Sequence, residues 1–464
     1  MSVAVDFDVA VIGGGSAGYA AASAAAQGGL RTVVVEGGRE VGGLCILRGC
    51  MPTKALLYAA EVKHLAERAA IWGIQIPEVR IDFARMMARK NAMIDDFAGY
   101  RRQQLESGRF QFVRADARFV DPHTVELDNG RRLRSAHFVI STGSTVSPRP
   151  LPQLGAIGCL TSDDVMALER LPQSIIVLGG GAVAAEFAQF FARVGVRVTL
   201  LQRSGHILRD FDDDAATTVE TVFRREGIEL FTGTRLIDAR CESGLKHITF
   251  EHAGKTLTVS AEEIFHGLGR SPNTFSLALA QAGVTTDQRG RIVTNDHMQT
   301  AAPHIFAAGD CTGPHEIVHI AIQQGEAAAH NILHPDSPRS VDYRLLTSVV
   351  FTEPQVACVG LTEAQARAQG RAVIAASYPF ADHGKSLLME AKDGFVKLLA
   401  DPRSGEILGG ACVGPLGGEI IHEIVAAMCK RMTVAELAAM PHYHPTLAEI
   451  WTYPAEELAA QITG

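Results

Sequence analysis

Two glycine-rich turns, each following an apolar strand-like run, constrain the fold of this chain most. Residues 7–12 (FDVAVI) are typical of a buried parallel strand, and the turn GGGSAG follows directly at residues 13–18. Residues 174–178 (SIIVL) and the turn GGGAVA at residues 179–184 repeat the arrangement. A helix-forming stretch and a second strand follow each turn, which is the order of a dinucleotide-binding βαβ unit. The pattern therefore predicts an α/β chain with two Rossmann-like domains.

The first unit carries the features of a nucleotide site. Gly13 allows the tight turn, Gly15 lets the backbone approach a pyrophosphate, and Gly18 lets the helix pack close to the strand. The second strand, residues 31–35, ends in Glu36, whose carboxylate accepts hydrogen bonds from ribose hydroxyls and repels a 2′-phosphate. The alternative is a glycine-rich turn in an ordinary α/β protein. The first strand, the helix, the second strand and the terminal Glu36 all occur at the expected positions, which favours dinucleotide binding.

The second unit ends differently. Its second strand, residues 197–201, is followed by Gln202 in place of an acidic residue, then by Arg203 and Arg209. An arginine near this point accommodates a 2′-phosphate, which favours NADPH over NADH. The alternative is that both arginines lie in a solvated loop, so NADH stays open as the second coenzyme.

Two cysteines lie just after the first unit, in the segment GGLCILRGCMPTK at residues 42–54. Pro52 suits the first turn of a helix, which places Cys50 at a helix N-terminus where a thiolate is stabilised. Lys54 adds a positive charge about one turn further on. This pattern indicates that Cys45 and Cys50 form a redox-active pair that passes two electrons to a cofactor. Two buried structural cysteines and a metal half-site are the alternatives, and no second Cys/His cluster has the spacing of metal ligands.

Three further segments have small residues or glycine at the end of an apolar run. They are residues 141–143 (STG), residues 267–273 (GLGRSPN) and residues 305–310 (IFAAGD). The first two are places where the chain leaves a domain and returns to it. The third predicts a strand over residues 305–310 that ends in Gly309 and Asp310, where Asp310 is placed to bind the ribityl or phosphate part of a flavin.

The segment PHYHPTLAE near the C-terminus holds His444 and Glu449. A carboxylate that fixes the tautomer of an imidazole raises its basicity, so the two residues suit an acid/base pair for proton exchange with a thiol. From the spacing alone, two surface histidines before a terminal helix are the preferred interpretation.

Taken in order, these segments resemble the FAD-dependent pyridine nucleotide–disulfide oxidoreductases, which include dihydrolipoamide dehydrogenase, glutathione reductase and mercuric reductase. The resemblance rests on GGGSAG, GGLCILRGCMPTK, STG, GGGAVAAE, GLGRSPN, FAAGDC and HYHPTLAE, and it covers essentially the whole chain. The form of the last motif is most similar to dihydrolipoamide dehydrogenase. The family implies FAD at the first site, a nicotinamide coenzyme at the second, and a homodimer whose active site is shared between subunits.

The resemblance also implies roles for single residues. Cys45 resembles the thiol that exchanges with the substrate, and Cys50 the thiol that contacts the flavin. Lys54 and Glu186 match an ion pair near the flavin, where hydride arrives. His444 resembles the catalytic acid/base and Glu449 its partner, and the His444–Pro445 bond is expected to be cis. The cofactor contacts implied are Glu36, Asp310 and His319, with Gly13, Gly15, Ser16, Ala17, Gly18, Gly43, Lys54, Thr142, Gly143 and Gly309 at the flavin, and Gly179, Gly181, Ala184, Arg203 and Arg209 at the nicotinamide coenzyme. Gly269 is a further cofactor contact.

Departures from the family pattern leave the subfamily open. Ala182 stands where glutathione reductases have a tyrosine, and Gln202 stands where dihydrolipoamide dehydrogenases usually have glutamate. The tail AEELAAQITG lacks the cysteine pair of some mercuric and large thioredoxin reductases. The sequence thus predicts dihydrolipoamide dehydrogenase-like activity on a small dithiol or disulfide. The alternatives are an NADPH-dependent, glutathione-reductase-like enzyme for another small disulfide, and a non-catalytic flavoprotein subunit of a multienzyme complex.

Composition and length complete the expectations. The 464 residues suggest about three domains: an FAD-binding domain at 1–150 and 271–340, an NAD(P)-binding domain at 151–270, and an α+β dimerisation domain at 341–464. The net charge of −8 gives no electrostatic footprint for nucleic acid or an anionic membrane. The start of the chain lacks a basic, apolar leader, so a cytoplasmic location is expected. A lipoyl-bearing protein is a possible partner, and no metal is expected.

Overall fold

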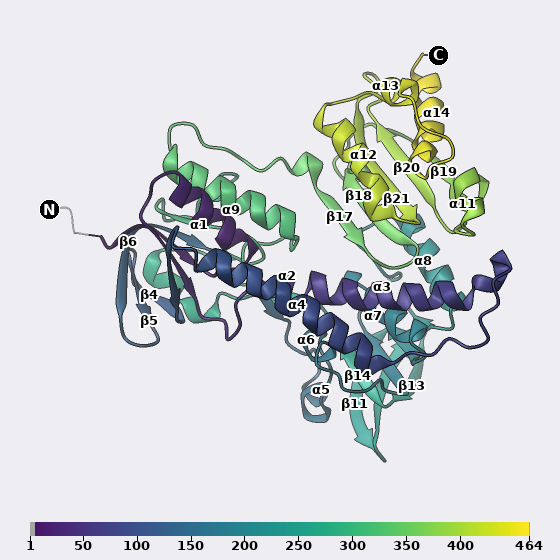
Figure 1. The fold of residues 1–464 in the computed structure, drawn as a ribbon, viewed down its shortest axis with the longest axis horizontal. Helices are drawn as coiled ribbons and strands as arrows, with labels where there is room; N and C mark the ends of the chain where they lie inside the picture. Colours follow the sequence, from purple (N-terminus) through teal and green to yellow (C-terminus); the bar gives the residue numbers. More distant parts are fainter. Residues whose placement is uncertain (1–4, 464) are drawn as a thin grey trace. The chain divides into compact units, whose positions relative to one another are not determined.

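The computed structural model describes residues 5–463 (Figure 1). These residues separate into two compact units. The first unit comprises residues 5–56, 82–148 and 269–341. The second comprises residues 57–81, 149–268 and 342–463. No helix in this described part of the chain is both long and apolar enough to cross a membrane.

The first unit is built on a seven-stranded sheet with the order β3-β2-β1-β6-β5-β4, in which β16 also pairs with β6. The central strands β1 (Phe7–Ile12), β2 (Thr32–Glu36) and β6 (Arg132–Ile140) are parallel, as are β3 (Gln111–Arg114) and β16 (Ile305–Ala307) with their neighbours. β4 (Ala117–Asp121) and β5 (Thr124–Leu127) extend the sheet in antiparallel pairing.

Helices of the first unit pack beside this sheet. The alanine-rich α1 (Ser16–Gln27) lies against α9 (Val318–Leu333), and α2 (Gly43–Leu47) lies against α4 (Phe83–Leu105). Small side chains on α1 allow this close packing, because Ala21, Ala22 and Ala25 are fully buried among the valines of the central strands.

The second unit contains three sheets. A parallel sheet has the order β10-β9-β8-β14, with β8 (Ser174–Leu178), β9 (Arg197–Leu201), β10 (Glu229–Phe231) and β14 (Glu263–His266). The helices α7 (Ala182–Arg193) and α8 (Asp213–Arg225) follow β8 and β9. An antiparallel sheet of β11 (Arg235–Glu242), β12 (Leu245–His252) and β13 (Lys255–Ala261) is inserted before β14.

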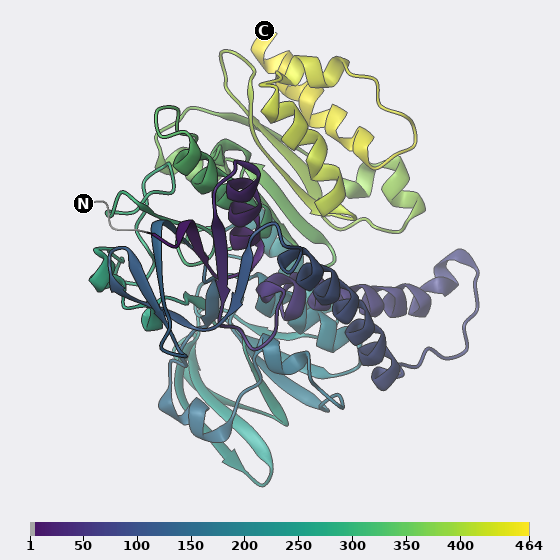
Figure 2. The same ribbon diagram turned by 60° about the vertical axis from the view of Figure 1, so that its left-hand side comes forward.

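The remaining sheet of the second unit is antiparallel, with the order β17-β18-β21-β20-β19. Helices α12 (Gly417–Cys429) and α14 (Thr452–Thr463) pack on its strands, and Figure 2 shows them in yellow along one side of the green sheet. The strands are β17 (Thr347–Val350), β18 (Gln355–Gly360), β19 (Ile374–Pro379), β20 (Phe395–Ala400) and β21 (Ile407–Gly414).

The mixed α/β class and the two Rossmann-like units are confirmed. The boundaries between the three expected domains stay a prediction. The second unit groups residues 149–268 and residues 342–463, which the sequence assigned to two different domains. It also includes residues 57–81, which the sequence assigned to the first domain. These residues contain the later turns of α3 (Cys50–Glu67), whose His64 lies 3.9 Å from Glu226 of the second unit.

Candidate functional site

The turn after β1 has the shape that dinucleotide binding requires. Gly13 has φ +103°, and a Cβ there would lie 2.4 Å from the carbonyl oxygen of Ser141. Gly15 is the N-cap residue of α1. A Cβ built on Gly15 would have one neighbouring heavy atom within 4 Å, Gly43 Cα at 3.9 Å. The first amides of α1 therefore face open space that a pyrophosphate fits.

Glu36 and Thr142 border the same turn. The Glu36 carboxylate accepts hydrogen bonds from the amides of Gly14 and Gly38, both at 2.7 Å. The hydroxyl of Thr142 is buried and has no hydrogen-bond partner among residues 5–463. A buried polar atom of this kind is usually satisfied by a ligand or water. Together with the open turn, it shows that this part of the first unit fits a bound dinucleotide.

The other residues expected at the flavin lie in the first unit as well. Asp310 follows β16 and accepts a hydrogen bond from Ser144 Oγ at 2.7 Å. The Gly309 amide donates to Gln324 Oε1 of α9 at 2.7 Å, which holds the turn against that helix. His319 lies in the first turn of α9 and is exposed. Gly143 and Gly269 both have positive φ, and the segments that contain them pair through β7 (Ser144–Val146) and β15 (Arg270–Pro272).

Cys45 and Cys50 form a hydrogen-bonded pair of thiols. Cys45 lies in the short helix α2, and Cys50 is the first residue of α3, as the sequence predicted. The hydrogen bond with Cys50 raises the pKa of the Cys45 thiol, burial raises it further, and the charge of Lys54 opposes the rise. In the reduced pair Cys45 thus holds the proton, and the helix N-terminus favours the thiolate on Cys50.

A pocket of about 280 Å³ lies between helices α1, α4 and α9. Tyr19, Ser23, Arg101 and Glu326 are among its lining residues. The Arg101 guanidinium lies 4.2 Å over the Tyr19 ring, and its charge interacts with Cys45. Its buried Nε and Nη1 atoms have no hydrogen-bond partner in the described part of the chain. Sequence reasoning missed Arg101, because no local motif surrounds it.

The second glycine-rich turn repeats the first. Gly179 has φ +108°, and a Cβ there would lie 2.4 Å from the carbonyl oxygen of Gly267. Gly181 caps α7 without a side-chain hydrogen bond, and a Cβ there would meet nothing within 4 Å, so the turn fits a second pyrophosphate. Ala184, in the third fingerprint position, is fully buried where the helix packs.

The end of β9 carries no acidic side chain. Gln202 is buried against Gly180 and donates to the carbonyl of His206 at 3.4 Å. Arg203 and Arg209 are both exposed in the loop that follows, and Arg209 lies 3.7 Å from Asp210. The loop that follows β9 thus carries two exposed arginines.

Helix α7 holds the segment at residues 351–354 through three of its side chains. The buried Glu186 carboxylate accepts the amide of Phe351 at 2.9 Å, and Gln189 Oε1 accepts the amide of Glu353 at 2.7 Å. Arg193 binds the Glu353 carboxylate at 2.5 Å. The sequence predicted an ion pair between Glu186 and Lys54, but no sequence pattern indicated the hydrogen bond from the Phe351 amide to Glu186.

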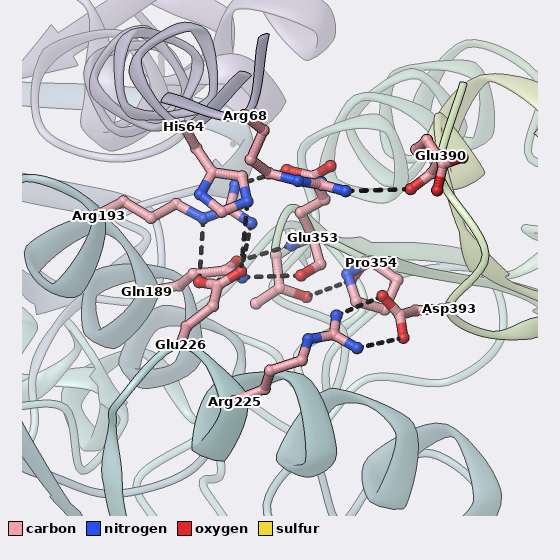
Figure 3. Close-up of polar contacts among 11 residues, drawn as sticks. His64, Arg68, Gln189, Arg193, Arg225, Glu226, Glu353, Pro354, Glu390 and Asp393 are labelled. Atoms are coloured by element: carbon pink, nitrogen blue, oxygen red, sulfur yellow. Dashed lines mark hydrogen bonds and ion pairs between the residues drawn. The ribbon is translucent and has the colours of Figure 1, made fainter. Parts of the chain in front are cut away.

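Arg193 is the centre of this network (Figure 3). Its side chain is 6% exposed, and it also binds Glu226 Oε1 at 2.6 Å and Glu226 Oε2 at 3.1 Å. Figure 3 shows Arg193, Glu226 and Glu353 pointing toward one another, with His64 of α3 above them. A buried guanidinium between two carboxylates joins α7, α8 and the segment before β18.

The structure brings His444 and Glu449 together. Nδ1 of His444 lies 3.0 and 3.1 Å from the two carboxylate oxygens of Glu449, and the His444–Pro445 bond is cis. The His444 side chain is 77% exposed, whereas Glu449 is buried in the short helix η6 (Ala448–Trp451). A third residue that the sequence did not indicate, His383, approaches Glu449 from the protein interior.

Comparison with protein families gives two matches. Residues 7–325 match the model described as "Pyridine nucleotide-disulphide oxidoreductase", and residues 346–455 match its dimerisation domain. Dihydrolipoyl dehydrogenase from Geobacillus stearothermophilus is 34% identical over 457 residues, covering 98% of this chain and 96% of that protein. Its counterpart from Thermus scotoductus is 35% identical over 462 residues, covering 98% of each chain. Mercuric reductase from Staphylococcus aureus is 31% identical and covers 96% of this chain and 81% of that protein.

Solved structures agree with this result. LpdA from Mycobacterium tuberculosis superposes with a TM-score of 0.87 at 27% identity, covering 97% of this chain and 99% of that one. The HOCl-induced flavoprotein disulfide reductase RclA from Escherichia coli superposes with a TM-score of 0.85 at 25% identity, with the same coverage.

Proposed function

This chain belongs to the pyridine nucleotide–disulphide oxidoreductase family, and on that premise we propose that it oxidises a small dithiol of the dihydrolipoamide type through Cys45 and Cys50. As a member it is an FAD-dependent enzyme that exchanges electrons between a nicotinamide coenzyme and a dithiol or disulfide. The observation that carries the proposal is the hydrogen-bonded thiol pair at the start of α3, beside Lys54.

The proposed reaction balances two electrons and two protons. A substrate thiolate attacks Sγ of Cys45 in the oxidised pair, the Cys45–Cys50 bond breaks, and Cys50 leaves as a thiolate. The second substrate sulfur then displaces Cys45, which releases the substrate as a disulfide. Bound FAD supplies the two-electron exchange between the thiol pair and the nicotinamide.

His444 takes the substrate proton in this proposal. Its Nδ1 faces Glu449, so the proton is taken up at Nε2 of the exposed side of the ring. The dimerisation domain supports a homodimer. We propose that His444 serves the thiol pair of the other subunit. A lipoyl-bearing protein as partner and a cytoplasmic location stay predictions.

The direct test is anaerobic turnover of dihydrolipoamide by the FAD-loaded enzyme with NAD⁺ and, separately, with NADP⁺. Rapid reduction of either coenzyme is the expected result. An enzyme that holds FAD but reduces neither coenzyme would contradict the proposal and would favour an NADPH-driven reductase of another disulfide.

That second function has its own support in Arg101. A guanidinium without hydrogen-bond partners for two of its nitrogens, which lines a pocket and interacts electrostatically with Cys45, suits a substrate that carries an anionic group. Dihydrolipoamide is neutral. Comparing the oxidation of dihydrolipoamide with the NADPH-driven reduction of a small anionic disulfide therefore distinguishes the two functions. Faster turnover of the anionic disulfide would support the second.

The two arginines after β9 predict the coenzyme. We expect Arg203→Gln together with Arg209→Gln to raise the KM for NADP(H) about tenfold and to leave the KM for NAD(H) within about twofold, because only the 2′-phosphate loses its cationic partners. Arg197→Gln is the matched control, since Arg197 is exposed at the opposite end of β9. Equal losses for both coenzymes would remove the reason to prefer NADPH.

A further inference from the structure

His383 is buried directly behind the His444–Glu449 pair. It precedes helix α11 (Gly384–Leu388) and has no exposed surface. Its Nε2 lies 3.3 Å from Glu449 Oε1, at ion-pair distance but without the alignment of a hydrogen bond. Its Nδ1 lies 2.8 Å from Ser386 Oγ, which is also fully buried. The Glu449 carboxylate therefore lies between two imidazoles, one exposed and one buried.

The surroundings of His383 determine its charge and its tautomer. Burial lowers the pKa of His383, while the Glu449 carboxylate opposes that fall. A neutral imidazole carries one N–H, and a carboxylate only accepts, so the proton belongs on Nε2, toward Glu449. Nδ1 is then an acceptor, which the Ser386 hydroxyl can satisfy as donor.

Aromatic packing keeps the His383 ring in this orientation. The rings of Phe380 and Tyr453 each meet it edge-on, with centroids 6.4 Å away. Tyr453 is itself stacked on Tyr378 of β19 at 3.9 Å. The ring has little freedom to turn Nε2 away from Glu449, because its neighbours on several sides are packed side chains.

We propose that His383 is a positioning residue: its Nε2, 3.3 Å from Glu449 Oε1, holds the Glu449 carboxylate with both oxygens toward His444 Nδ1. The proposal rests on the proposed function, in which His444 exchanges the proton. Within the His444–Glu449 pair, His383 lies against Glu449, so its effect on proton exchange is expected to pass through Glu449. A residue that only supports the fold would act independently of Glu449.

A double-mutant cycle tests this dependence. We expect His383→Leu to lower kcat for dithiol oxidation about tenfold with little change in the KM for the coenzyme. His383→Gln keeps an N–H donor and is expected to retain activity within about twofold of the wild type. In the Glu449→Gln background, His383→Leu is expected to change kcat less than about twofold. Equal effects of His383→Leu with and without Glu449 would overturn the proposal.

The matched control is His442→Gln. His442 lies two residues before His444, and its Nε2 lies 2.6 Å from Oε1 of a different carboxylate, Glu423. Its effect is expected to be the same with and without Glu449→Gln. Ser386→Ala serves as a milder variant if His383→Leu folds poorly. It removes the donor to Nδ1 and is expected to lower kcat in the same direction by a smaller factor.

A crystal structure of the His383→Leu or Ser386→Ala homodimer separates this inference from the proposed function, since it needs no turnover. Loss of the arrangement in which both Glu449 oxygens lie about 3 Å from His444 Nδ1 is expected. An unchanged pair in both variants would overturn the positioning role even if the enzyme oxidises dithiols as proposed. A displaced pair in an enzyme with no dithiol turnover would support the role and contradict the proposed function.

Discussion

Replacing Cys45 with serine is expected to lower dihydrolipoamide turnover by at least about a thousandfold, because a serine hydroxyl cannot form the mixed disulfide with the substrate. FAD binding is expected to persist, since the glycine-rich turn and Glu36 that border the dinucleotide site are untouched. Turnover is measured as coenzyme reduction, and FAD content by absorbance of the purified protein.

Two measurements make the Cys45→Ser result specific. Cys241→Ser is the control, because Cys241 is an exposed free thiol on β11 in the other unit, and wild-type turnover is expected. Oxidation of the reduced coenzyme by an artificial one-electron acceptor is expected to continue in Cys45→Ser, since that route bypasses the thiols. More than about a tenth of wild-type dithiol turnover in Cys45→Ser would contradict the role of Cys45.

Replacing Arg193 with methionine is expected to have the largest effect on stability. The change leaves the Glu226 carboxylate, which is 12% exposed, without its cationic partner, and removing one member of a buried ion pair costs about 3–5 kcal/mol. The partly exposed Glu353 adds less, because solvent screens it. The midpoint of urea unfolding, followed by circular dichroism, is expected to fall accordingly.

Arg225→Met is the matched control for Arg193→Met. Arg225 binds Asp393 through both terminal nitrogens in the same region of Figure 3, but the two side chains are 58% and 39% exposed. An exposed pair contributes about 0–1 kcal/mol, so only a small shift in the midpoint is expected. In Arg193→Met the further change Glu226→Gln is expected to recover part of the loss, because it removes the unpaired charge. Equal shifts for the two single arginine variants would contradict this account.

Sequence reasoning placed the elements of the two nucleotide-binding units well, because short-range patterns determine them. The run at residues 7–12 is β1, and the run at residues 197–201 is β9. Strand β16 stops at Ala307 rather than continuing to Asp310, because Gly309 has φ +79° and its carbonyl accepts the Thr312 amide in a turn. Glycine at the end of an apolar run signals that a strand ends but not at which residue.

No short-range sequence pattern indicated the contacts between residues that are far apart in the chain. His383 and Glu449 meet only because β19, α11 and α14 pack in one unit, and the charge of Arg101 interacts with Cys45 only because α4 lies against α2. Spacing in the sequence describes one helix face or one turn. The residues that support a motif from elsewhere in the fold therefore require the structure.

The different anchoring of Glu36 and Gln202 has a consequence for protein engineering. Glu36 is tied to two backbone amides, so exchanging it would disturb the turn that it helps to build. The Gln202 amide donates to Ser204 Oγ and to the carbonyl of His206, while the second turn keeps its shape through Gly179. Changes at the end of β9 are thus expected to disturb the second turn less than changes at Glu36 disturb the first.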